Sequence, residues 1–178
     1  MAKTIRMKLS SDSIKQAIKQ LESYKARIPR LTKEITRRLA AIGLEEAQIR
    51  FSGAMYDGDN DALVSLKPTE SGYEVIAYGQ SVCFIEFGSG VHYNGSGGNY
   101  PLPKPAGIVG IGQYGRGHGS NDMWRYQGNP GTDGIEVTDA TGTYVLTKGN
   151  PAQMPMYHAL VQMKREAEQI VKDVFANA

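Results

Sequence analysis

The chain has 178 residues, of which 40% are hydrophobic and 21% charged, a balance typical of one soluble globular domain rather than a disordered chain. No run reaches the roughly 18 apolar residues that a membrane span needs, and the N-terminal residues lack the apolar core of a signal peptide. The single cysteine, Cys83, excludes an internal disulfide and fits synthesis in a reducing cytoplasm. We therefore expect a single domain over residues 1–178 with no membrane contact.

The net charge of +2 is unevenly distributed along the chain. Residues 1–50 carry 12 Lys and Arg against 5 Asp and Glu, whereas residues 51–178 carry 8 against 13. A basic end is typical of a helical face in contact with solvent, or of a nucleic-acid surface. It is also typical of a subunit face that meets an acidic face on the next subunit. The sequence leaves these three interpretations open.

The first regular elements predicted are two amphipathic helices over about residues 12–51, one on either side of Pro29. An apolar row with helical spacing begins at Ile14. Pro29 is expected to end or kink the first helix, because proline has no N–H to donate and its ring clashes with the preceding turn. Gly53 is expected to end the second helix, since glycine enters the left-handed conformation at low cost.

A short hairpin and a short helix follow. Residues 62–67 and 73–78 alternate between apolar and polar side chains and are separated by turn residues, which predicts two paired strands. Residues 82–87 read VCFIEF, a run too short for periodicity to separate helix from strand. Ser81 and Gly88 occupy the positions of helix caps, which favours the helix.

The composition then changes to a glycine-rich segment. Between Gly88 and Gly134 lie 14 of the 21 glycines, in a stretch far longer than ordinary loops. A purely solvated linker would not carry as many large apolar residues as this segment does. We expect the loop to be poorly ordered alone and to fold against a partner through residues such as Ile111, Tyr114, Trp124 and Tyr126.

The last elements predicted are a second hairpin and a terminal helix. Residues 135–138 and 143–147 form the hairpin, so the sheet and long loop span about residues 62–147. A clear apolar stripe predicts a C-terminal helix over about residues 155–176, with a proline such as Pro155 at its first position. The sequence thus predicts an α+β fold in which a small antiparallel sheet packs against two N-terminal helices and a C-terminal helix.

Two fragments resemble binding motifs but lack the required context. Residues 110–115 match G-x-G-x-x-G, yet no predicted strand precedes them and no helix follows, as a dinucleotide site requires. Residues 57–61 begin like a calcium-binding loop, but Ala62 and Pro68 stand where glycine and glutamate are needed, so a polar turn is the better interpretation. The three histidines lack metal-ligand spacing. We expect no cofactor and no metal.

No complete catalytic set is evident either. His118, Ser120 and Asp122 are the residue types of a triad, but a glycine-rich stretch is a poor scaffold for its geometry. Cys83 has no adjacent cation to activate it and is expected to be a buried apolar residue. Glu86 could serve as a catalytic carboxylate, although we expect it to face outward or to pair with an arginine. The sequence therefore predicts no enzyme.

Two stretches resemble a known family. Residues 84–90 read FIEFGSG, which is similar to the "hydrophobic–Glu–Phe–Gly–Thr/Ser–Gly" signature of bacteriophage tail-completion, or head–tail joining, proteins. In that family a Gly/Pro-rich insert follows, often with Trp-x-Tyr, here Trp124 to Tyr126. A "Pro-Ala-x-Pro-Phe-Met" turn then leads into the final helix, and residues 147–156 read TKGNPAQMPM. Met154 and the long insert depart from the usual pattern, whereas the order of elements agrees over nearly the whole chain.

The resemblance implies a structural virion protein of the phage neck, made in the host cytoplasm and placed between head connector and tail. It implies a homo-oligomeric ring, hexameric by family resemblance, that contacts the head connector or head-closure protein and the tail tube or tail terminator. DNA in the channel would be in passive contact with such a ring. The candidate contact residues are Glu86, Gly88, Gly90, Ile111, Tyr114, Trp124, Tyr126 and Pro155. We hypothesise that Glu86 pairs with a cation of its own or a neighbouring subunit.

Two other functions remain open at this point. One is a phage-encoded hydrolase with a glycine-rich lid, centred on His118 with Asp122 or Glu86. The other is a DNA-binding module that uses the basic N-terminal helices, whose affinity for duplex DNA would fall steeply with salt.

Overall fold

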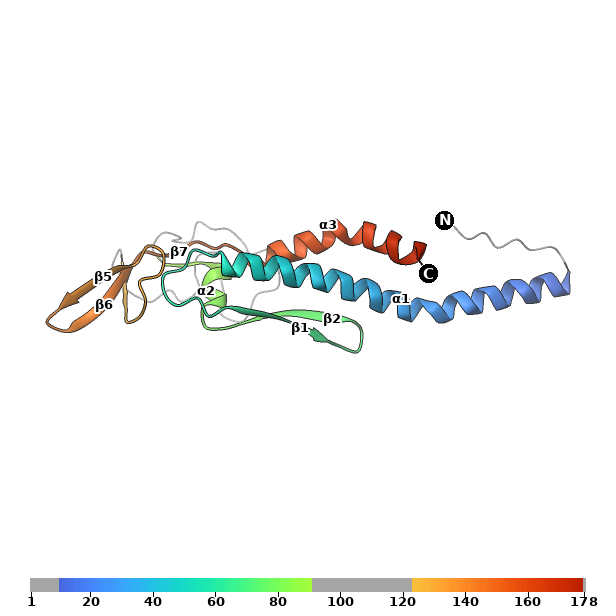
Figure 1. Ribbon diagram of the computed structural model, residues 1–178, viewed down its shortest axis with the longest axis horizontal. Helices are drawn as coiled ribbons and strands as arrows, with labels where there is room; N and C mark the ends of the chain where they lie inside the picture. Colours follow the sequence, from blue (N-terminus) through green and yellow to red (C-terminus); the bar gives the residue numbers. More distant parts are fainter. Residues whose placement is uncertain (1–9, 91–122, 178) are drawn as a thin grey trace.

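The computed structural model describes residues 10–90 and 123–177. Figure 1 shows an elongated molecule built along one long helix, with a second helix on one side of it and a β-hairpin on the other. The helices are α1 (Ser11–Ser52), α2 (Val82–Phe87) and α3 (Pro155–Ala176). The strands are β1 (Leu63–Pro68), β2 (Tyr73–Tyr78), β3 (Ser89–Gly90), β4 (Trp124–Tyr126), β5 (Ile135–Asp139), β6 (Gly142–Thr147) and β7 (Gly149–Asn150).

The N-terminal region forms one helix, so the prediction of two separate helices is wrong. The hydroxyl of Ser10 accepts a hydrogen bond from the Ser13 amide and caps α1, and Gly53 ends it. Pro29 lies inside the helix. A proline there removes one hydrogen bond and displaces one carbonyl, a defect that a helix absorbs by bending when both flanks remain helical. Figure 1 shows α1 bending about midway along its length, in agreement with that expectation.

Two apolar clusters hold the second half of α1 in place. The predicted C-terminal helix is confirmed: α3 runs antiparallel to α1, and its Ile170 and Val174 pack on Leu31. Nearer the end of α1, Phe51 and Ala47 pack with Ile85 of α2 and Ala159 of α3. This second cluster joins all three helices, because its members come from α1, α2 and α3. Burying a side chain such as Phe51 or Ile85 contributes about 1.5–3 kcal/mol to stability.

Within the described residues the strands form three small antiparallel sheets, with orders β1-β2, β3-β7 and β4-β6-β5. Both predicted hairpins are confirmed, with Leu63 opposite Tyr78 in the first and Ile135 opposite Leu146 in the second. The helical prediction for residues 82–87 is also confirmed. The α+β class therefore holds. No helix in the described part of the chain combines the length and the hydrophobicity that crossing a membrane demands.

Candidate functional site

The two stretches that carry the sequence resemblance pack directly against each other. The Gln153 amide donates to the carbonyl oxygen of Ile85 (2.9 Å), and β3 pairs with β7, where Gly90 lies opposite Gly149. We call this region the junction: α2, β3, β7 and the start of α3. It is formed by segments about 65 residues apart in sequence, and it is the candidate site that the structure assembles.

Glu86 lies inside the junction with only 3% of its surface exposed. Its carboxylate accepts hydrogen bonds from the backbone amides of Met156 (2.8 Å) and Tyr157 (3.2 Å) in the first turn of α3. These amides have no partner within their own helix, and the positive end of the helix dipole favours an anion at this place. The expectation that Glu86 faces outward is therefore wrong, because its carboxylate serves as a cap for another helix.

Gly88 and Pro155 have backbone roles at the same junction. Gly88 ends α2 at φ 73°, and a Cβ there would lie 2.5 Å from the Ala152 nitrogen. Pro155 is fully buried at the first turn of α3, where its missing N–H costs nothing. Met154 precedes it in the left-handed conformation, with φ 49°, and makes no side-chain cap. The carboxylate of Glu86 supplies the cap of α3 instead.

The aromatic candidates are only partly placed. Tyr126 lies in β4 opposite Val145, and its hydroxyl donates to the Asn129 carbonyl (2.6 Å). Burial, followed by the charge of Asp57, raises the pKa of Tyr126 to about 12. Trp124 lies opposite Thr147 in the same sheet. Ile111 and Tyr114 lie outside the described residues.

A buried polar cluster lies beside the junction, and the sequence reasoning missed it. The carboxylate of Asp57 accepts from the Thr147 hydroxyl (2.5 Å) and from the Asp133 amide (2.7 Å). The side-chain oxygen of Asn150 accepts from the Asp57 amide (2.7 Å). Asp57, Thr147 and Asn150 are each less than 10% exposed. They tie the turn after α1 to β6 and β7, and the sequence signal for this was limited to the polar turn at residues 57–61.

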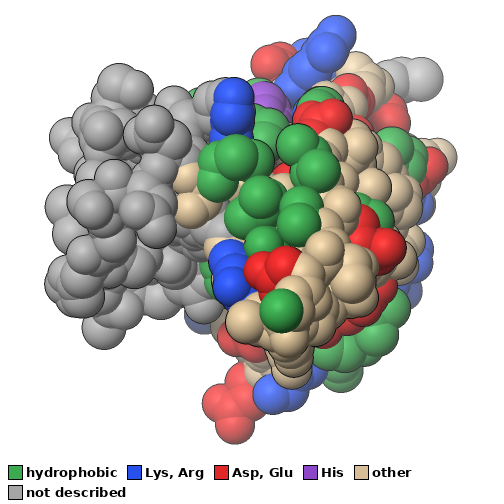
Figure 2. Space-filling view, turned by 90° about the vertical axis from the view of Figure 1, so that its left-hand side faces the viewer, with side chains coloured by type: hydrophobic (Ala, Val, Ile, Leu, Met, Phe, Trp, Pro, Cys, Tyr) green, Lys and Arg blue, Asp and Glu red, His purple; other side chains and the backbone are tan. Residues whose placement is uncertain are grey.

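Two hollows open next to this cluster. The larger, of about 490 Å³, is lined by Tyr56, Asp57, Phe84, Arg125 and Tyr126, among others. The smaller, of about 360 Å³, is lined by residues that include Met55, Met123, Ile135 and Pro151. Figure 2 views the molecule from this end and shows hydrophobic side chains gathered together with acidic side chains among them.

Two strands that are far apart in the sequence pair with neighbouring residues beside the junction. Gly90 of β3 pairs with Gly149, and Trp124 of β4 pairs with Thr147. Residues 147–149 therefore hold β3 and β4 close to each other.

Asp61 holds the start of α2. Its carboxylate accepts from the Ser81 hydroxyl (2.7 Å), the Ser81 amide (2.8 Å) and the Gln80 amide (2.8 Å). Ser81 was predicted to cap α2 with its own side chain, but it makes no such bond. These three donors, the Ser81 hydroxyl most of all, lower the pKa of Asp61 from 3.8 to about 2.

This lowered pKa predicts a defined pH dependence. Because the folded value lies below the unfolded one, the ionised carboxylate stabilises the fold at neutral pH, and this contribution is lost as the pH falls from about 4 towards 2. We expect Asp61→Asn to be less stable than the wild type at neutral pH and to match it near the acid end of that window. Urea unfolding across this pH range tests the expectation. Ser81→Ala removes one of the three donors and should weaken the pH dependence of stability in part. A difference in stability between Asp61→Asn and the wild type that stays constant with pH would contradict the role of the ionised carboxylate.

The remaining chemistry of the described residues is limited. Burial, with a further effect of the Arg50 charge, lowers the pKa of His158. Within residues 10–90 and 123–177, no three His, Cys, Asp or Glu side chains are grouped so that they could hold a metal ion. His118 and Asp122, the candidates for a hydrolase centre, lie outside these residues.

Comparison with protein-family models, with curated proteins and with solved structures finds no match for this chain.

Proposed function

We propose that this chain is a non-enzymatic structural protein of a phage neck, which assembles as a ring and joins the tail to the head connector. The observation that carries the proposal is the junction. The two sequence stretches similar to tail-completion proteins, residues 84–90 and 147–156, are far apart in the chain, and they contact each other through Glu86, Gly88 and Gly90. A family signature that encodes one structural unit would have this property.

The roles of these residues support structure rather than catalysis. Glu86 is engaged by the amides of Met156 and Tyr157, and Gly88 lies against the backbone of Ala152. Each residue fixes the position of an element, and β3 and β4, on either side of residues 91–122 in the sequence, pair with residues 147–149 at the same place. The junction would therefore act as the rigid base from which the insert reaches the neck or tail partner.

Deletion of the gene from the phage genome tests the proposal. We expect negative-stain microscopy to show filled heads and separate tails, and a plasmid copy of the wild-type gene to restore joined particles. A His118→Ala copy should restore them equally well, whereas a hydrolase centred on His118 would lose this ability. Normal particles from the deletion strain, or purified virions that lack the chain, would contradict the neck function.

A further inference from the structure

The first half of α1 presents an apolar surface to solvent. Figure 1 shows this part of the helix, residues 11–30, extending past the ends of α3 and of the β1–β2 hairpin. At 1.5 Å per residue it is about 30 Å long. Its large apolar side chains are between 39% and 55% exposed: Ile14, Ile18, Leu21, Tyr24 and Ile28. We call these five residues the open stripe.

The open stripe continues a surface that is used for helix packing within the chain. Ile14, Leu21 and Ile28 are seven residues apart, and the same spacing continues to Ile35 and Ile42. Ile35 and Ile42 pack beside Leu31 against Ile170 and Val174 of α3, so the repeat marks a face that accepts a neighbour.

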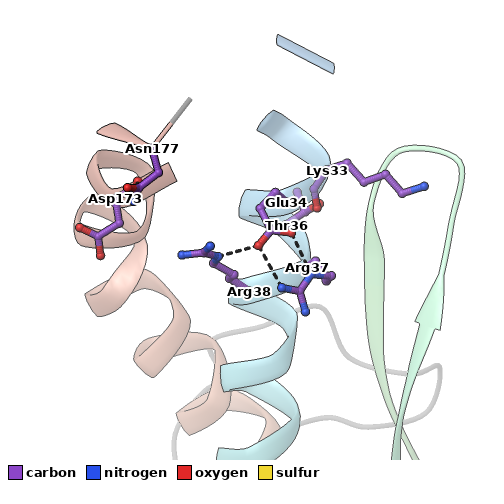
Figure 3. A network of polar contacts seen from close by, with 7 residues as sticks. All are labelled: Lys33, Glu34, Thr36, Arg37, Arg38, Asp173 and Asn177. Carbon is purple, nitrogen blue, oxygen red and sulfur yellow. Dashed lines mark hydrogen bonds and ion pairs between the residues drawn. The ribbon is translucent and has the colours of Figure 1, made fainter. Parts of the chain in front are cut away.

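The packing ends where α3 ends. At this level a polar group closes the α1–α3 pair: Glu34 accepts hydrogen bonds from Arg37 (2.9 Å) and Arg38 (2.7 Å), and Arg38 extends towards α3, where it lines a hollow together with Asn177 (Figure 3). The hydrogen bonds from Arg37 and Arg38 lower the pKa of Glu34 to about 2. Beyond this polar group the apolar face of α1 continues without α3.

The charges beside the open stripe argue against pairing with the same stripe of another copy. Residues 11–30 carry five Lys and Arg against two Asp and Glu. Lys25 lies on the same helix face as the open stripe, four residues after Leu21 and three before Ile28, and Lys15 lies three residues before Ile18. Two such helices side by side would bring cations together at the flanking positions, which destabilises a coiled coil. The stripe therefore calls for an apolar surface with acidic neighbours.

The outer face of the β1–β2 hairpin has these properties. Val64 and Ala77 pack inward against the core, so the alternation of strand side chains directs Leu63, Ile76 and Tyr78 outward. Leu63 and Tyr78 are directly opposite each other and are 57% and 50% exposed.

Acids outnumber cations on the hairpin itself. Residues 63–78 carry Glu70 and Glu74 against the single cation Lys67, which lies opposite Glu74. Glu74 lies on the outer face and Glu70 in the turn, and both are exposed. The hairpin thus offers apolar side chains on which the open stripe can pack, and a net negative charge that complements the cations beside the stripe.

We propose that residues 11–30 of one copy dock on the outer face of the β1–β2 hairpin of a second copy. Residues 11–30 cannot dock on the hairpin of their own chain, because α1 carries them away from it (Figure 1). The contact joins two different surfaces, so each copy keeps one free surface of each kind until the chain of copies closes into a ring. The inference rests on the proposed function, for which it names the contact between subunits.

Disulfide cross-linking tests the contact directly. In a Cys83→Ser background, the full chain carrying both Leu21→Cys and Tyr78→Cys is oxidised mildly and analysed on a non-reducing gel. We expect a ladder of covalent oligomers from the double variant and chain-length protein from each single variant. A covalent dimer from Leu21→Cys alone would overturn the proposal, because it would show that two stripes pair with each other.

Charge reversal provides a second, non-covalent test. Lys15→Glu with Lys25→Glu should weaken self-association at least tenfold in analytical ultracentrifugation, and adding Glu70→Lys with Glu74→Lys should restore it. The control Lys164→Glu with Arg165→Glu changes two exposed cations on α3 and should leave association unchanged. Association that is indifferent to all these charges contradicts the inference.

The remaining outcomes separate this contact from the neck function. A monomer that binds duplex DNA with steeply salt-dependent affinity would assign the basic helix to nucleic acid and overturn the contact. If the double variant forms rings but its cysteines at positions 21 and 78 do not cross-link on oxidation, the proposed contact is overturned and the neck function is unaffected. Virions that lack the chain would overturn the neck function whatever the cross-linking shows.

Discussion

Glu86→Ala should lower the free energy of unfolding by about 3 kcal/mol, because hydrogen bonds to a charged group contribute roughly 1.5–3 kcal/mol each and this carboxylate accepts two. The substitution also leaves the amides of Met156 and Tyr157 in a buried site without their acceptor. For a chain of this length the loss corresponds to a fall in Tm of about 6–12 °C. Urea unfolding at low protein concentration, where association is negligible, measures it.

Two further variants make the origin of this effect visible. Glu86→Gln keeps the size and one acceptor oxygen but loses the charge, so its destabilisation should be intermediate. Glu74→Ala removes an exposed acid from β2 and should change stability by less than about 0.5 kcal/mol. In hydrogen exchange, the amides of Met156 and Tyr157 should lose protection in Glu86→Ala before the middle of α3 does. A Glu86→Ala protein as stable as Glu74→Ala would contradict the role of the carboxylate as a cap.

Much of the fold follows from local patterns in the sequence. The stripe of α3, the two hairpins and the limits of the N-terminal helical region were all predicted within one or two residues, because period and turn chemistry are local properties. The short helix α2 was predicted from Ser81 and Gly88 alone. Gly88 does end it, whereas Ser81 stands at the right position for another reason, since its hydroxyl is bound by Asp61.

The parts that sequence reasoning missed depend on contacts between distant segments. The cap of α3 comes from Glu86, about 70 residues earlier, and nothing near Met154 indicates it. The burial of Asp57 depends on Thr147 and on the Asp133 amide, which a reading of residues 57–61 cannot include. At Pro29 a local preference is instead overridden by its surroundings. Proline favours the end of a helix, but the helical structure on both sides of Pro29 continues through it.

The same distinction applies to the candidate site. The resemblance to a linear motif predicts partner contacts at Glu86, Gly88, Gly90 and Pro155, and the structure brings all four to the junction. There they make contacts within the chain that position α2 and β3 against β7 and the start of α3. The residues that we propose for contact with another subunit are instead those of the open stripe, whose helical spacing is visible in the sequence and whose exposure is not. Exposure depends on where α3 ends, which is a property of the packed molecule.

Gly88→Ala, which adds one methyl group to the junction, should strongly lower the free energy of unfolding. The residue has φ 73°, where a side chain costs about 1–3 kcal/mol, and the added Cβ would lie 2.5 Å from the nitrogen and 2.9 Å from the Cα of Ala152. Both atoms belong to the backbone and cannot rotate away. Separating α2 from the segment before α3 adds an overpacking cost of about 1–3 kcal/mol. We expect the free energy of unfolding, measured with urea, to fall by about 4 kcal/mol in total.

Gly142→Ala is the matched control, because Gly142 also has a positive φ, 123°, but an added Cβ would have no atom within 4 Å. It should therefore show the conformational cost alone, and Gly88→Ala should be less stable than Gly142→Ala by at least about 2 kcal/mol. Should Gly88→Ala fail to accumulate as folded protein while Gly142→Ala does, the conclusion is the same. Equal stability of the two variants would mean that α2 and the segment before α3 can separate freely. The junction could then not be the rigid base that the proposed neck function requires.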